Sequence, residues 1–353
     1  MILYSLVAVL AAGLTLPVDN HYENKGFLYT RQQVLNRLCL VSVFLLLFLV
    51  SALRLNVGND YAKYVEFMHL IRCDAVVPTE FGFNWVVKIL YGISGFENYL
   101  LVFAVFAFAT IYLFLKAIYQ QADSFPFSFF LFMALGYYFQ TFNTVRYYLA
   151  LAIALFAIPY VLRKEWGKFI LLILLGATMH KSLLVVIPLY FLASRCWKKW
   201  QLVLAALFCS TFFFLQDFYL KLVIFLYPTY EDTEYLEGGT SMINILRCAA
   251  VLVLALLCYK KCIKENIRNR FYFYCNLGAL VMYVCCSFLP IISRIGYYLT
   301  ITHIFFLPAL VNGIENEKLK KLCRVGVILA GIVYFAVFIL MKAGENGLRI
   351  LPY

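Results

Sequence analysis

Charged residues are scarce in this chain, making up 14% of its 353 residues, whereas hydrophobic residues make up 64%. This composition leaves too little polar surface for a soluble globular protein. The eleven cysteines form no disulfide or zinc pattern. Nucleophilic triads, glycine-rich phosphate loops and paired metal carboxylates are also missing from the sequence. The composition therefore predicts an all-α, polytopic membrane protein, and the missing motifs predict that it uses no metal and no cofactor.

Long apolar runs predict about ten spans in a single integral membrane domain, 1–353. A run of about 17 or more mostly apolar residues can cross the ~30 Å hydrocarbon core as a helix. Such runs lie at 2–17, 38–54, 98–116, 126–142, 144–162, 200–217, 242–259, 271–291, 295–311 and 325–341. The first run lacks the basic start of a signal peptide, so we expect it to be a retained helix.

Two further apolar pieces do not fit a simple span. The piece at 83–93 is too short to cross and predicts a short re-entrant helix within an outer loop, 55–97. The piece at 167–193 is interrupted at His180 and flanked by basic clusters, so it is expected to be a broken helical hairpin that enters and leaves on one side. A single span there, which would reverse every later loop, stays open as an alternative. A second outer loop is expected at 218–241.

Basic loops set the predicted orientation, because they remain on the cytoplasmic side. The loop at 260–270 holds five basic residues, and similar clusters lie near 163–168, 195–199 and 318–324. With these loops inside, the whole formal net charge of +12 faces the cytoplasm. A nucleic-acid partner is not needed to explain this charge. The prediction is a multi-pass protein whose termini face outside.

Ionisable residues at membrane depth mark candidate functional sites. In the predicted topology, such residues gather near the outer leaflet: Arg54, Asp60, Glu80, Arg146, His180, Lys181 and Arg294. Arg146, Ser182 and Arg294 each begin an inward-running segment, so helix N-termini favour an anion there. Two guanidinium forks with Lys181 suit a diphosphate better than a carboxylate. The alternative is that both arginines only extend to the lipid headgroups.

A series of short motifs follows the chain in order. It comprises Gly58-Asn59-Asp60-Tyr61-Ala62-Lys63-Tyr64, Glu80-Phe81-Gly82-Phe83-Asn84, Asn143-Thr144-Val145-Arg146 with Leu149-Ala150, His180-Lys181-Ser182, Arg294 with Tyr298, and Leu351-Pro352-Tyr353. In this order, over roughly 54–353, the chain resembles the EpsG family of Wzy-like polysaccharide polymerases. It departs from the family at Phe81 and Tyr147, where proline and glutamine are frequent.

The resemblance implies a GT-C-like fold and a metal-independent glycosyltransferase. The implied reaction transfers a growing glycan from undecaprenyl diphosphate to a lipid-linked repeat unit at the outer face of the bacterial cytoplasmic membrane. The implied partners are the undecaprenyl-diphosphate-linked donor and acceptor and the lipid bilayer. A chain-length regulator and a flippase are further candidates, and no nucleic acid is expected.

That reaction assigns roles to the outer residues. Arg146, Arg294 and Lys181 would stabilise the diphosphate, and Asp60 or Glu80 would be the general base, ahead of His180. Simpler alternatives stay open: Asp60 as a helix N-cap, Glu80 paired with Arg54 or Arg72, and His180 as a hydrogen-bonded core residue. Arg54, Tyr147 and Tyr298 are candidates for substrate contact, although both tyrosines also fit interfacial anchors.

Three rival functions remain open. An O-antigen ligase would use the same donor, but is expected to have a larger outer domain than this chain offers. A transporter or flippase for lipid-linked sugars would line a path through the membrane with its charges instead of gathering them at one face. A membrane acyltransferase would need a buried His or Asp on the cytoplasmic side, and the sequence offers none.

Overall fold

A computed structural model describes residues 2–22, 30–226, 242–289, 292–341, 344 and 348–349. Within these ranges the chain is helical and contains no strand. It divides into two compact units, which are described separately. The first comprises Met1–Tyr160, Trp166–Leu184 and Ile314–Tyr353, and the second comprises Val161–Glu165 and Val185–Gly313.

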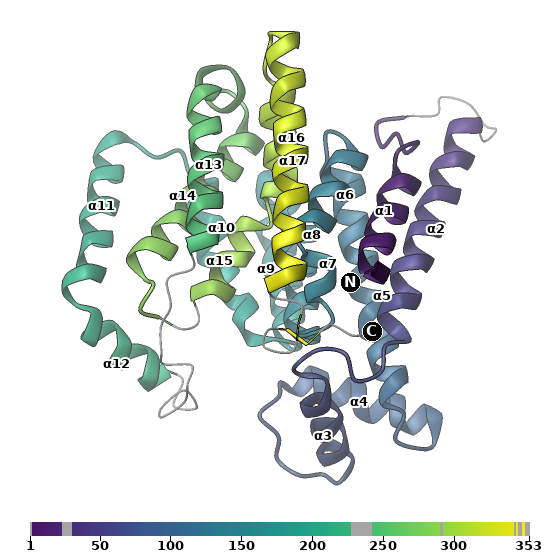
Figure 1. Cartoon of the computed structure of the whole chain (residues 1–353). Helices are drawn as coiled ribbons and strands as arrows, with labels where there is room; N and C mark the ends of the chain where they lie inside the picture. The colour runs from purple at the N-terminus through teal and green to yellow at the C-terminus, as the bar shows by residue number, and fades with distance from the viewer. Residues whose placement is uncertain are drawn as a thin grey trace. The chain divides into compact units, whose positions relative to one another are not determined.

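The first unit is built on long helices that pack side by side. Its helices are α1 (Ile2–Thr15), α2 (Arg31–Ala52), α3 (Tyr61–Arg72), α4 (Phe81–Ser94), α5 (Tyr99–Gln121), α6 (Phe125–Ala134), α7 (Tyr137–Gln140), α8 (Val145–Leu162), α9 (Trp166–Ala177), the 3₁₀ helix η1 (Lys181–Val185) and α17 (Glu317–Met341). Helix α2 packs against α1 and α5, while α6 contacts α1, α5 and α17. Helices α3 and α4 lie beyond the ends of α2 and α5 (Figure 1).

A break divides the apolar run at 126–142 into α6 and α7. Gly136 lies between them with φ = 75°, a conformation that glycine adopts without strain. A β carbon at this position would lie 3.2 Å from the ring of Phe338 on α17. The close approach of α17 and the positive φ together explain why the run does not continue as one helix.

The second unit is arranged around a central helix, α14. Its helices are α10 (Val186–Ser194), α11 (Lys199–Phe214), α12 (Gln216–Leu226), α13 (Met242–Leu257), the π-helix η4 (Tyr259–Ile263), α14 (Ile267–Cys285), α15 (Ile292–Thr300) and α16 (His303–Asn312). Helix α14 contacts α10, α11, α13, α15 and α16. The run at 295–311 is broken into α15 and α16, and α11 and α12 meet at a bend of 84°.

In the part of the chain that the structure describes, five helical segments are long and apolar enough to cross a membrane: α2, α5, α8, Ile292–Asn312 and α17. A sixth is added if α11 and α12 count as one bent span. Other predicted runs form shorter apolar helices, including α1, α6, α9 and α13. The all-α, polytopic membrane bundle predicted from composition is confirmed.

The irregular segments contain more helix than the sequence predicted. The segment 55–97 holds two helices, α3 and α4, where the apolar pattern indicated one. Helix α3 matches the alternative in which Asp60 precedes a short helix, although the apolar pattern alone does not indicate it, because several of its residues are charged. The segment 167–193 is broken at residues 178–180, between α9 and η1. The hairpin and the re-entrant course stay predictions. Residues 227–241 of the expected outer loop, and Leu351–Tyr353, lie outside the described residues.

Candidate active site

Several predicted site residues lie at helix N-termini in the first unit. Asp60 is the N-cap residue of α3 and Glu80 that of α4. Arg146 lies in the first turn of α8, and Lys181 is the first residue of η1. Backbone N–H groups at such ends lack helical partners and give the end a partial positive charge. Here Glu80 contacts both Arg146 and the backbone of Lys181, which come from two other segments.

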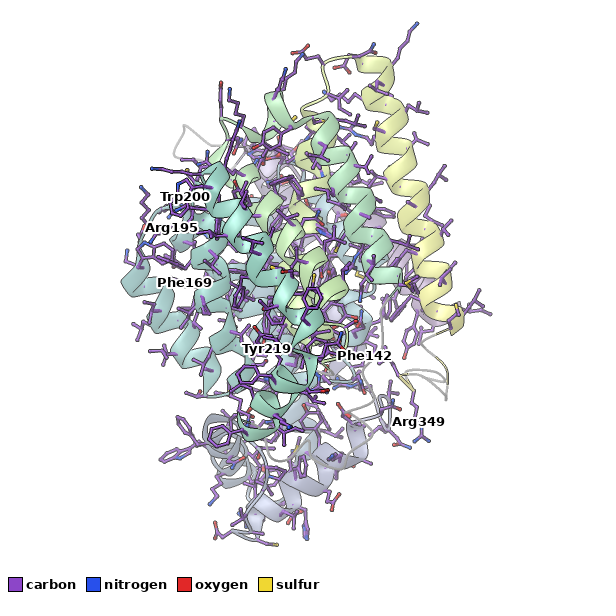
Figure 2. All side chains as sticks on the ribbon, turned by 90° about the vertical axis from the view of Figure 1, so that its left-hand side faces the viewer. Phe142, Phe169, Arg195, Trp200, Tyr219 and Arg349 are labelled. Atoms are coloured by element: carbon purple, nitrogen blue, oxygen red, sulfur yellow. The ribbon has the colours of Figure 1, made fainter. Side chains whose placement is uncertain are left out.

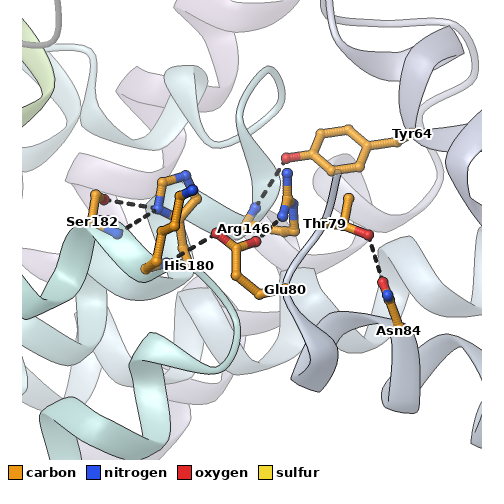
Figure 3. A network of polar contacts seen from close by, with 8 residues as sticks. Tyr64, Thr79, Glu80, Asn84, Arg146, His180 and Ser182 are labelled. Atoms are coloured by element: carbon orange, nitrogen blue, oxygen red, sulfur yellow. Dashed lines mark hydrogen bonds and ion pairs between the residues drawn. The ribbon is translucent and has the colours of Figure 1, made fainter. Parts of the chain in front are cut away.

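The carboxylate of Glu80 lies at the centre of these contacts (Figure 3). One oxygen accepts a hydrogen bond from Nη1 of Arg146, and the other accepts from the backbone N–H of Lys181 at 3.0 Å. The side chains of Glu80 and Arg146 are 15% and 13% exposed. The alternative in which Glu80 pairs with Arg54 or Arg72 is therefore wrong. Glu80 begins α4 facing α8, so Arg146 is the arginine within its reach.

Two aromatic rings fix the orientation of Arg146. Its guanidinium carbon lies 5.6 Å from the ring centre of Tyr64 and 5.3 Å from that of Phe83. Its backbone N–H donates to the Tyr64 hydroxyl at 3.4 Å. Burial raises the pKa of the Tyr64 phenol, although the Arg146 charge opposes this shift. Tyr64 therefore remains neutral at physiological pH, and the cation lies beside two neighbouring aromatic rings that attract it.

Sequence reasoning assigned no role to Tyr64 or Phe83. Both residues belong to the motifs from which the family resemblance was drawn. Tyr64 lies one helical turn after Asp60, and Phe83 lies three residues after Glu80, so helix periodicity brings them toward the same end of the unit. The spacing of Tyr64 from Asp60 and of Phe83 from Glu80 is the sequence pattern that could have indicated their place near the site.

His180 is held by its neighbour Ser182. Nδ1 of His180 accepts from the backbone N–H of Ser182 at 3.3 Å and lies 2.8 Å from its Oγ. These contacts assign the proton of the neutral imidazole to Nε2. The ring is half-buried and meets Tyr147 edge-on at 5.6 Å. His180 is thus prepared to donate from Nε2, and it does not lie in the core.

Two glycines allow the segments to approach this closely. A β carbon on Gly82 would lie 2.7 Å from the backbone oxygen of Thr178, which accepts the Gly82 N–H at 3.0 Å. Gly58 has φ = 103°, and a β carbon there would lie 2.5 Å from the backbone oxygen of Phe142. Phe142 is labelled in Figure 2. Only glycine fits both the positive φ and the close backbone contact at position 58. The Gly58 contact places the start of α3 next to the segment before α8. The Gly82 contact places the start of α4 next to the segment before η1.

The loop before α3 is held by hydrogen bonds from three consecutive backbone N–H groups that end at Asp60. The N–H groups of Gly58 and Asn59 donate to the backbone oxygens of Arg349 and Leu348 at 2.8 and 3.1 Å. The N–H of Asp60 donates to Oδ1 of Asn143 at 3.1 Å. The Asp60 side chain makes no capping hydrogen bond. Its position matches the N-cap alternative, but its carboxylate does not serve as the cap.

Arg54 is enclosed in the protein, with 2% of its surface exposed. Its Nη1 donates to the backbone oxygen and hydroxyl of Ser51. Its guanidinium carbon lies 5.0 Å from the ring centre of Phe103 and 5.4 Å from that of Phe142. In this conformation Arg54 therefore stabilises the C-terminal end of α2 through its hydrogen bonds to Ser51. Tyr147 is also buried. Substrate contact by either residue stays a prediction.

Arg294 and Tyr298 belong to the second unit. Arg294 lies in the first turn of α15, at a helix N-terminus as predicted. Tyr298 is completely buried, and its backbone oxygen accepts from the hydroxyl of Tyr190 at 2.9 Å. A joint diphosphate site of Arg294 with Arg146, and a sugar contact by Tyr298, stay predictions.

Comparison with known proteins decides the family. The sequence model of the EpsG family matches residues 37–353, nearly the whole chain. The chain belongs to the EpsG family. EpsG proteins are Wzy-like, glycosyltransferase-like polysaccharide polymerases of membranes. No curated protein and no solved structure matches the chain. The matched region includes every EpsG motif residue described above, and membership supports a polysaccharide polymerase type of function.

Proposed function

We propose that this protein transfers a growing glycan from undecaprenyl diphosphate to the terminal sugar of a lipid-linked repeat unit. The reaction would take place at the outer face of the bacterial cytoplasmic membrane. The observation that supports the proposal is the contact of Glu80 with Arg146 and the Lys181 backbone at converging helix N-termini. Family membership supplies the class of product, and this cluster supplies an anion site at which the reaction can occur.

The Glu80 carboxylate marks the donors that a diphosphate would use. Arg146 offers a planar fork whose Nη1 now binds one carboxylate oxygen, and the Lys181 N–H binds the other. Phosphate oxygens fit the same kind of donors at a helix N-terminus. Binding of the donor lipid would displace Glu80 from Arg146. The side chain of Lys181 would add a further cation, and the role of Arg294 as a second guanidinium stays a prediction.

Transfer breaks the bond between the anomeric carbon and the diphosphate oxygen and forms a bond from that carbon to the acceptor oxygen. Arg146 stabilises the negative charge that develops on the leaving diphosphate. His180 donates a hydrogen bond to it from Nε2. The proton of the acceptor hydroxyl passes to Glu80, which is a free carboxylate once the diphosphate has taken its place on Arg146. Asp60 is the alternative base.

The experiment that tests this function is polymerisation by purified protein. The protein is incubated in detergent with EDTA and a lipid-diphosphate-linked repeat unit, and the products are separated on a gel. We expect a ladder of longer glycans that disappears in Arg146→Ala and persists in Arg72→Ala, an exposed arginine at the end of α3. A ladder unchanged by Arg146→Ala contradicts the site. Passage of lipid-linked sugar across proteoliposomes without a ladder indicates a transporter.

The two candidate bases can be separated by neutralising each carboxylate. Glu80→Gln keeps an oxygen for the Lys181 N–H but removes the base, so kcat should fall by about 10²- to 10⁴-fold. Asp60→Asn is expected to keep most of the rate. The opposite result would assign the base to Asp60.

A further inference from the structure

A pocket of about 220 Å³ lies between the end of α3 and the first two turns of α4. Its lining includes Ile71 and Asp74 on one side, and Phe81, Asn84, Trp85 and Lys88 on the other. Phe81 follows Glu80 directly in the chain, so the same turn of α4 borders both the Arg146 contact and this pocket. None of the functions assigned above uses its lining residues.

The lining combines open aromatic faces with a few fixed polar groups. Phe81 and Trp85, one turn apart on α4, are each 67% exposed. Lys88 donates a hydrogen bond to Asp74 across the pocket, and this contact lowers the pKa of the Asp74 carboxyl. Asp74 therefore remains ionised and able to accept hydrogen bonds. The Thr79 hydroxyl donates to Oδ1 of Asn84 at 2.5 Å, which orients the amide.

This lining fits a sugar better than a lipid chain. An acyl chain would remove Asp74 and Lys88 from water without giving them new partners, which is costly. A saccharide has an apolar ring face that packs on an aromatic side chain and hydroxyl groups that hydrogen-bond carboxylate, amide and ammonium groups. The polar groups of the pocket would keep their hydrogen bonds in that complex.

We propose that the α3–α4 pocket is a saccharide subsite that holds the glycan of the lipid-linked acceptor beside Glu80. This inference rests on the proposed function for the identity of the glycan. Trp85 is the platform for a sugar ring, while Asp74, Asn84 and Lys88 bind its hydroxyl groups. Because Glu80 and Phe81 are consecutive, a sugar held in the pocket lies next to the carboxylate that takes the acceptor proton.

The test measures binding of the free repeat-unit oligosaccharide, without lipid or diphosphate, to the purified full chain by calorimetry. Trp85→Ala should weaken binding about tenfold, because it removes the apolar surface that the sugar covers. Trp85→Phe should restore most of the affinity. The matched control is Ile93→Ala, which changes a 75% exposed residue of α4 outside the pocket and should leave binding unchanged. In the polymerisation assay, Trp85→Ala should raise KM for the acceptor and leave kcat near the wild-type value.

The outcomes separate this subsite from the proposed reaction. Arg146→Ala should abolish the ladder but leave oligosaccharide binding intact. If Arg146→Ala keeps the ladder while Trp85→Ala weakens binding, the assigned reaction site fails and the subsite stands. Equal oligosaccharide affinity of wild type and Trp85→Ala overturns the subsite.

Discussion

The two units place their polar groups differently. In the first, Glu80, Arg146 and Lys181 meet at helix N-termini, and the first two keep 15% and 13% of their side-chain surface exposed. In the second, Asn276 and His303 lie within apolar helices with no exposed surface. Partly exposed charged groups at helix ends can exchange their hydrogen-bond partners for a ligand. Fully buried neutral groups inside a helix bundle hydrogen-bond only within the protein.

The hydrogen bonds of Asn276 illustrate the second arrangement. Its Nδ2 donates to the backbone oxygen of Cys248 at 3.1 Å, and its Oδ1 lies 2.8 Å from Nε2 of His303. One amide thus joins α13, α14 and α16. Because each such bond in a membrane protein contributes only about 0.6 kcal/mol, the second unit uses polarity to fix packing. The first unit concentrates charge at helix ends, where we propose that it takes part in the reaction.

The largest expected effect comes from changing the guanidinium forks. Arg146→Lys keeps the charge but loses the planar fork, so polymerisation should fall about 100-fold or more. Arg294→Lys is expected to lose most activity as well if both units contribute to the diphosphate site. The measurement is the initial rate of ladder formation. A loss in Arg146→Lys alone would confine the anion site to the first unit, and near-normal rates in both variants would remove the diphosphate assignment.

A smaller effect is expected from Gly82→Ala. The new methyl group would meet the Thr178 backbone and push α4 away from η1, breaking the bond between Glu80 and the Lys181 N–H. Misplacement of a reacting group by about 1 Å can cost about 100-fold in rate, and a partial shift costs less. The matched control is Gly92→Ala on the same helix, where the methyl group meets open space. Gly92→Ala should keep the rate, and equal losses in both variants would contradict the role of Gly82.

The sequence predicted the helical bundle and the polar residues at its helix ends, because apolar runs and isolated charges can be recognised in short stretches of sequence. It placed Arg146 at a helix N-terminus correctly. It did not find Arg146 as the partner of Glu80, and kept Arg54 or Arg72 open instead, because a pair between residues 66 positions apart depends on how Gly82 and Thr178 approach. It also missed the breaks at Gly136 and after Thr300, which depend on local backbone geometry inside apolar runs. Helix α3 has no long apolar run to indicate it.

The smallest expected effect is in the second unit. Asn276→Ala and His303→Ala should each lower the melting temperature while leaving the initial rate of polymerisation at 20 °C, roughly room temperature, close to that of wild type. The coupling between them in a double-mutant cycle should be about 0.6 kcal/mol, since each loses a bond that the other also makes. Thermal unfolding in detergent and the ladder assay provide the two readouts. A large fall in rate without a fall in melting temperature would show that the buried pair takes part in the reaction, and the contrast between the two units would then fail. Unchanged stability would instead show that helix packing alone holds α13, α14 and α16 together.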